Sequence, residues 1–280
     1  MIAIALFAGL LAEPAYEQAL RDFQQNRYAE AESKLRLVNP RTFSVQFLLG
    51  ATLVHLGKSE EAVAELWVAH RLQPRHPDAL KLLAAELLRL QRPRDVIALQ
   101  PKLESLSRDE EAHLLLLQAY QDRGDSGDIE KGLALARRAL ARFPKSAQLH
   151  AWMGYELRET GQLADARKYL EQSLRLNPVD EFPRLILADV LLRQGHHEEA
   201  MHRFQALTAT GNPEARAGLA RALAGLDRID EAIAELEKAV QKAPEQAQFH
   251  LELSRLYARA GRSEEARREA EIFRTLRRQP

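Results

Sequence analysis

The chain has 280 residues, of which 46% are apolar and 29% are charged, with 40 basic against 40 acidic side chains. This composition supports a sizeable buried core, and the zero formal net charge gives no overall attraction to nucleic acid or to an anionic membrane surface. There are no cysteines, which excludes disulfides, thiolate metal ligands and a cysteine nucleophile. Alanine, leucine, glutamate and arginine dominate, which favours helices, and no alternating run of β-branched residues predicts a strand.

The first predicted element is an uncharged apolar run, Ile2 to Ala12, directly before Glu13. It is too short for a membrane span, which needs roughly 20 residues. It fits the apolar core of a secretory signal peptide or a short anchor, with cleavage after Ala12. The lack of a basic residue before it and the bulk of Leu10 favour the alternative, a helix packed on the first repeat. We expect residues 1–12 to be a leader, the only membrane contact, and the protein to be periplasmic or secreted, with a cytoplasmic protein as the alternative.

From residue 13 onward the sequence repeats itself. Small residues recur in pairs in which the two members lie twelve positions apart, such as Gly50/Ala62 and Gly154/Ala166. After the second member come apolar residues at helical spacing, and then usually a proline. Successive second members lie 31 to 36 positions apart. This period predicts one array over residues 13–280, with units at about 13–42, 43–76, 77–109, 110–146, 147–180, 181–212, 213–246 and 247–280.

Each unit is predicted to form two antiparallel helices joined by a tight turn. Small side chains on both helices let the axes approach where they cross, and a turn glycine such as Gly57 or Gly161 supplies the positive φ that ends the first helix. Proline, as at Pro74 and Pro178, ends the second helix. A single hairpin cannot bury its apolar face, whereas stacked hairpins bury a continuous core.

The full pattern is clearest in residues 47–74, FLLGATLVHLGKSEEAVAELWVAHRLQP, and 151–178, AWMGYELRETGQLADARKYLEQSLRLNP, and it returns in 186–204 and 250–273. This pattern resembles the tetratricopeptide repeat family over about residues 13 to 280. The resemblance implies an all-α fold, a right-handed α–α superhelix (solenoid) of about eight helix hairpins. It also implies a concave groove, lined by the first helices, that binds other proteins or peptides.

Two central units depart from the pattern. In the third unit Pro101 stands inside the expected second helix, which we expect to be broken at Gln100. In the fourth unit the turn is three residues longer, and we expect residues 122–128, DRGDSGD, to form an exposed loop. The middle of the array should therefore be its least regular part.

Sequence motifs typical of catalytic, phosphate-binding or metal-binding sites are either absent or better explained as parts of a turn and a helix start. His196 and His197 fall in the turn after Gly195, and Glu198 and Glu199 occupy the first helical turn, where acidic residues favour the helix dipole. No glycine-rich phosphate loop, H-E-x-x-H pair or G-x-S-x-G turn is present. We therefore predict no catalytic residue, no metal, no cofactor and no enzymatic activity.

Three further histidines, His113, His150 and His250, fall at equivalent places on first helices. A residue repeated in register is more often a packing choice than a ligand. We therefore predict that these histidines pack rather than bind.

Candidate binding residues lie on the groove-facing side of the first helices, read at i, i+3/i+4 spacing. They are Phe47, His55, Trp152, Tyr155, Arg158, Asp189, Arg193, Arg221, Arg255 and Arg259. Trp152 is either a groove anchor, as tryptophan often is at hot spots, or packing between helices. The Lys and Asn residues with which some members of the family grip a C-terminal carboxylate are missing from the corresponding positions.

From these observations we predict a non-enzymatic scaffold that binds another protein or peptide in the groove and does not bind nucleic acid. One alternative is an obligate accessory or regulatory subunit of an envelope enzyme or assembly complex. Another is a small-ligand binder, which would need a closed apolar pocket that an open groove rarely offers. We expect a monomer, or a homodimer through the C-terminal unit, because Phe273 stands where other units have small residues. Phe273 would then be either a terminal cap or a self-association contact.

Overall fold

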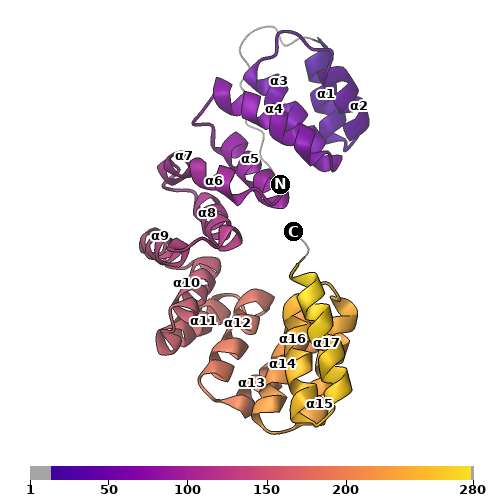
Figure 1. The fold of residues 1–280 in the computed structure, drawn as a ribbon. Helices are drawn as coiled ribbons and strands as arrows, with labels where there is room; N and C mark the ends of the chain where they lie inside the picture. Colours follow the sequence, from indigo (N-terminus) through magenta and orange to yellow (C-terminus); the bar gives the residue numbers. More distant parts are fainter. Residues whose placement is uncertain (1–13, 279–280) are drawn as a thin grey trace. The chain divides into compact units, whose positions relative to one another are not determined.

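The computed structural model describes residues 14–278, and the leader expected at residues 1–12 lies outside this part. The described residues form α-helices and one short 3-10 helix, with no β-strand among them, which confirms the expected all-α class (Figure 1). No helix in residues 14–278 has the length and apolar character that a membrane crossing requires. The chain divides into two compact units, of which unit 1 ends at Phe143 and unit 2 begins at Pro144.

Unit 1 is a succession of helix hairpins. Its helices are α1 (Pro14–Gln24), α2 (Tyr28–Leu35), α3 (Phe43–His55), α4 (Ser59–Leu72), α5 (Pro77–Arg89), α6 (Pro93–Ala98), α7 (Gln100–Ser105), α8 (Glu110–Arg123) and α9 (Asp128–Arg142). Except for α6 and α7, helices that are consecutive in the chain lie side by side and alternate in direction (Figure 1). The helices α1, α3, α5 and α8 are the first helices of these hairpins.

Unit 2 repeats the same construction. Its elements are α10 (Ala147–Glu159), α11 (Leu163–Leu176), α12 (Glu181–Arg193), α13 (His197–Leu207), η1 (Thr208–Thr210), α14 (Pro213–Gly225), α15 (Ile229–Lys242), α16 (Ala247–Arg259) and α17 (Ser263–Leu276). The first helices α10, α12 and α14 also contact one another in order. The single array over residues 13–280 stays a prediction.

Close crossing of the two helices explains the small residues of each hairpin. A Cβ atom added to Gly154 would lie 2.5 Å from Cγ of Leu170, and one added to Gly50 would lie 2.7 Å from Cγ of Leu66. Neither contact leaves room for a side chain, so the glycines let α10 and α3 approach their partner helices. The turns have the predicted conformation, since Gly57 and Gly161 have φ values of 72° and 75°.

First and second helices begin differently. Several first helices start with a side-chain cap, in which Asp109 Oδ1 accepts the backbone N–H of Ala112 at 3.2 Å and Ser146 Oγ accepts that of Leu149 at 3.0 Å. Second helices such as α4 lack a capping side chain and carry acidic residues in the first turn instead. Both arrangements offset the exposed N–H groups and the positive end of the helix dipole.

The third hairpin is broken as Pro101 predicts. Helix α6 ends at Ala98, Leu99 caps it, and α7 begins at Gln100. In the fourth hairpin residues 124–127 form an exposed loop, as expected, but Asp122 and Arg123 belong to α8 and Asp128 is buried at the start of α9. The Arg123 side chain donates to Asp128, and the backbone N–H of Asp125 donates to Asp128 Oδ2 at 3.0 Å.

The buried Asp128 fixes the inserted turn of the fourth hairpin, which we expected to be only an exposed loop. Its hydrogen bond with Arg123 lowers the pKa of the Asp128 carboxyl below its usual range, against the opposing effect of burial. The inserted turn is therefore tied to the ends of both helices that it connects.

Short helices and an exposed loop should make the centre of the chain open more easily than its neighbours. In a stack of repeats, local stability depends on each repeat and its nearest neighbours. We expect amide hydrogen exchange within residues 93–128 to be faster than within 150–200, measured by mass spectrometry on the intact chain. Uniform protection across both segments would show that the break at Leu99 has no energetic cost.

The last hairpin differs from the others where Phe273 replaces a small residue. The equivalent Ala69, Ala139 and Ala239 are completely buried. Phe273 is partly exposed, and the guanidinium of Arg277 lies 5.8 Å from its ring centroid. Both alternatives for Phe273, a terminal cap and a homodimer contact, stay predictions.

Candidate functional site

An aromatic cluster lies on the first helices of unit 2. The ring of Trp152, on α10, is 5.6 Å from that of Tyr155 and 5.4 Å from that of Phe182 at the start of α12. Trp152 is 8% exposed, so it packs between the two helices, whereas Tyr155 and Phe182 are partly exposed. The cluster therefore has a buried base and an accessible edge.

Arg158 joins this cluster to an ion network. Its guanidinium lies 4.8 Å from the ring centroid of Tyr155, within the range of a cation–π interaction. One of its nitrogens is 3.2 Å from Asp189 on α12, and another is 2.5 Å from its neighbour Glu159. Arg158 is thus held by a ring on one side and by carboxylates on the other.

Asp189 is shared by three arginines from three successive first helices. Besides Arg158, its carboxylate lies 2.9 Å from Arg193 Nε on α12 and 3.7 Å from Arg221 on α14. Asp189 is only 8% exposed, and burying a charged group is costly unless it is paired and hydrogen-bonded. Its partners are 13%, 46% and 40% exposed, so the network is buried at its centre and open at its rim.

The network continues to the last first helix. Arg221 also lies 3.7 Å from Glu252 on α16. Glu214, at the start of α14, is an exposed residue, yet desolvation raises the pKa of its carboxyl above the usual range. Arg221 opposes this rise, and the Glu252 and Asp189 carboxylates add to it. We call Arg158, Asp189, Arg193, Arg221 and Glu252 the Asp189 network.

Arg255 and Arg259, on α16, lie outside this network. Arg255 is exposed and makes no ion pair within residues 14–278. Arg259 donates to the carbonyl of Ala224 at 3.3 Å and to Asp227 at 3.2 Å, so it holds the turn between α14 and α15.

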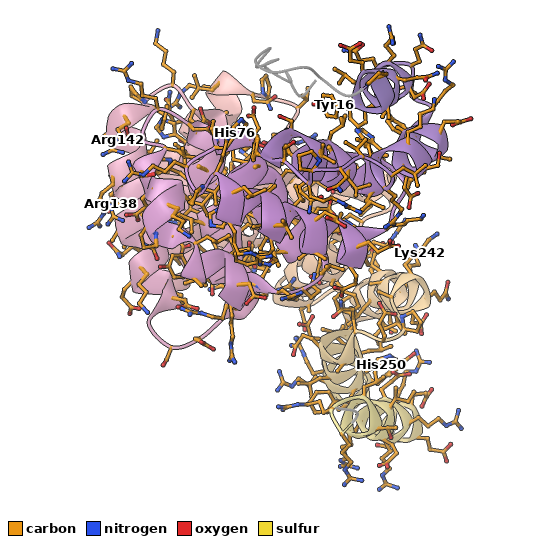
Figure 2. All side chains as sticks on the ribbon, turned by 90° about the horizontal axis from the view of Figure 1, so that it is seen from above. Tyr16, His76, Arg138, Arg142, Lys242 and His250 are labelled. Carbon is orange, nitrogen blue, oxygen red and sulfur yellow. The ribbon has the colours of Figure 1, made fainter. Side chains whose placement is uncertain are left out.

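The two candidates of unit 1, Phe47 and His55, lie in separate aromatic groups along α3. The ring of Phe47 is 5.7 Å from Phe43 and 5.6 Å from His76, and Phe47 is only 5% exposed. The ring of His55 stacks on Tyr28 at 4.4 Å, with the planes nearly parallel. Figure 2 labels His76, which belongs to the loop before α5.

One residue of the site escaped the sequence analysis. Phe182 follows the capping residue Asp180, whose side chain accepts the backbone N–H of Phe182 at 3.1 Å. An aromatic residue in the first turn of a first helix, beside the first helix that carries Tyr155, was the signal that could have found it.

The histidines repeated in register pack against the chain, as predicted. His150 and His250 each donate an Nε2 proton to the carbonyl of the proline six positions earlier, Pro144 and Pro244, at 3.0 and 2.9 Å. His250, labelled in Figure 2, is also 2.6 Å from Glu269 through Nδ1. Within the described part of the chain, no group of three or more His, Cys, Asp or Glu side chains could hold a metal ion.

Comparison with known proteins assigns the fold. One tetratricopeptide repeat model matches residues 157–211, 191–250 and 227–271, and a second matches 117–181. A curated Arabidopsis thaliana protein, the TPR repeat-containing thioredoxin TTL4, is 37% identical over 82 residues, which are 29% of this chain and 12% of that protein. The chain therefore spans about an eighth of the length of this relative.

Solved structures of low sequence identity share the architecture. Human IFIT1 aligns with a TM-score of 0.63 and 20% identity, over 92% of this chain and 67% of that one. The Cut9–Hcn1 structure aligns with a TM-score of 0.61 and 14% identity, over 95% and 61% of the two chains. At these identities the likeness concerns the fold alone, and it confirms the expected solenoid class.

Proposed function

Because the chain belongs to the tetratricopeptide repeat family, we propose that it is a non-enzymatic scaffold that binds a segment of another protein. The binding surface that we propose is the first-helix face of unit 2. The observation that carries this proposal is the accessible edge of the Trp152–Tyr155–Phe182 cluster, which Arg158 connects directly to the Asp189 network.

The chemistry of this surface suits a peptide with both apolar and polar side chains. Tyrosine and arginine are enriched among the residues that dominate binding energy at interfaces. Tyr155 and Phe182 offer apolar area, while the half-exposed Arg193 and Arg221 offer N–H donors. Asp189 holds these arginines before a partner arrives, which reduces the side-chain entropy lost on binding.

The test is a paired replacement on this face, Tyr155→Ala with Arg193→Glu. We expect this variant of the full chain to capture its partner from native extract about tenfold less well, a loss typical of one hot-spot residue. Helical content, measured by circular dichroism, should be unchanged because both side chains are at least partly exposed.

A matched control lies on the second helix of the same hairpin. Tyr169→Ala with Arg175→Glu on α11 makes the same chemical change away from the proposed surface. Full capture by the Tyr155/Arg193 variant, or an equal loss in the control, would contradict the proposed surface. An accessory subunit would instead appear as a partner retained at fixed stoichiometry, without which the wild-type chain aggregates.

A further inference from the structure

A second surface, on unit 1, has a strong excess of positive charge. It comprises the C-terminal ends of α4, α7 and α9 and the loops after α4 and α7, at residues 70–76, 102–108 and 137–142. Its exposed basic side chains are Arg71, Arg75, Lys102, Arg108, Arg137, Arg138 and Arg142. Glu104 is the single acidic residue in these three segments. We call this surface the basic flank.

Side-chain contacts join its three parts in order. Lys102 Nζ, on α7, lies 2.7 Å from His70 Nε2 on α4, and Arg138, on α9, lies 2.8 Å from Glu104 on α7. Arg142 follows Arg138 by one helical turn and therefore shares its face. Figure 2 shows Arg138 and Arg142 at the outer edge of α9, with their side chains directed away from the ribbon.

The charge of the basic flank is largely uncompensated. Arg71, Arg75, Arg108, Arg137 and Arg142 have no ion-pair partner within residues 14–278. The C-terminal ends of three helices contribute about half a negative charge each, far less than the excess of the basic side chains.

Three acidic side chains at the starts of the following helices form their ion pairs with α5. Asp78, Asp109 and Glu111 lie 3.9, 2.8 and 2.9 Å from the ammonium of Lys81 on α5. These three carboxylates therefore pair with Lys81 and not with the basic flank.

We propose that the basic flank binds an acidic segment of a partner protein. Leu72 lies between Arg71 and Arg75 and is 50% exposed, so the surface offers apolar area between its charges. A polypeptide can bring an apolar side chain to Leu72 as well as carboxylates to the arginines, whereas a phosphate backbone brings charge alone.

The contacts between the helix ends also fit a polypeptide. Lys102 on α7 reaches His70 on α4, and Arg138 on α9 reaches Glu104 on α7, so one extended segment can cross the three helix ends in the order α4, α7, α9. A segment with acidic residues at regular intervals, and apolar residues between, brings carboxylates to the cations and an apolar side chain to Leu72. Because the cations are exposed, this binding weakens as salt is added.

The experiment uses fluorescence anisotropy with the full chain and two synthetic peptides, one with glutamate at every third position and leucine between, the other with glutamine in place of glutamate. We expect the glutamate peptide to bind about tenfold more tightly at low salt, and Arg138→Glu with Arg142→Glu to remove this preference. The control, Lys238→Glu with Lys242→Glu on α15, makes the same change in net charge on a second helix of unit 2. It should bind the glutamate peptide as the wild type does.

Three results would overturn the proposal. They are equal binding of the two peptides, an equal loss in the Lys238/Lys242 control, and tighter binding of an RNA oligonucleotide or an anionic lipid vesicle than of the glutamate peptide. The Tyr155/Arg193 variant should bind this peptide normally. The experiment therefore distinguishes an error in the basic-flank proposal from an error in the proposed binding surface on the first-helix face of unit 2.

Discussion

Replacing Phe204 by alanine is expected to lower the free energy of unfolding by about 3–5 kcal/mol. Phe204, on α13, is 1% exposed and is among the largest fully buried side chains of the described residues. Its ring packs against α14, where a Cβ atom added to Gly218 would lie 2.2 Å from ring atom Cε1. The replacement removes buried apolar area and leaves a cavity that two packed helices close only in part.

The same contact predicts how Gly218→Ala behaves in two backgrounds. In the wild type the added methyl must displace the ring, which costs about 1–3 kcal/mol, against a gain of about 1 kcal/mol in helix propensity. In the Phe204→Ala background the methyl enters vacated space, so Gly218→Ala should stabilise by about 1 kcal/mol. Urea unfolding followed by circular dichroism gives all four stabilities.

A control on the same helix separates packing from general damage to α13. His202 is exposed, so His202→Ala should change stability by less than about 0.5 kcal/mol. Additive effects of Phe204→Ala and Gly218→Ala would contradict the account, because residues in direct contact should show a coupling energy.

The hairpins could be predicted from the sequence because their causes are local. Positive φ at Gly57 and the break before Pro101 follow from the geometry of single residues. The small residue Gly154 likewise requires a close crossing. The sequence did not show what fills each crossing, Leu170 at Gly154 and Phe204 at Gly218, because these contacts depend on the register of one helix on another.

For the candidate site, the sequence predicted only which side of the first helices carries it. Helical spacing placed Tyr155 and Arg158 on one side of α10, and in the structure Arg158 contacts both the Tyr155 ring and Asp189 on the next first helix. The helical spacing gave no sign that the Asp189 carboxylate would pair with three arginines, because that pairing requires neighbouring hairpins to stack. The same spacing grouped Phe47 with His55, but they lie about two turns apart on α3 and contact different aromatic rings.

Replacing Asp189 by alanine is expected to lower the free energy of unfolding by about 2–3 kcal/mol, in the range measured for hydrogen bonds to charged groups. Without this carboxylate Arg158, which is 13% exposed, keeps only Glu159 as a charge partner. Arg193 retains Glu159 at 4.0 Å, and Arg221 retains Glu252 at 3.7 Å. The loss should stay below the value for a fully buried pair, because Arg193 and Arg221 can turn toward water.

The matched control is another aspartate that pairs with an arginine of a first helix. Asp227 is 90% exposed and lies 3.2 Å from Arg259, and its φ of 60° is tolerated by asparagine, so Asp227→Asn should change stability by no more than about 0.5 kcal/mol. Chemical unfolding of both variants measures the difference. If Asp189→Ala is as mild as Asp227→Asn, the three arginines are held by the packing of their own helices, and Asp189 does not organise the surface that we propose for the partner.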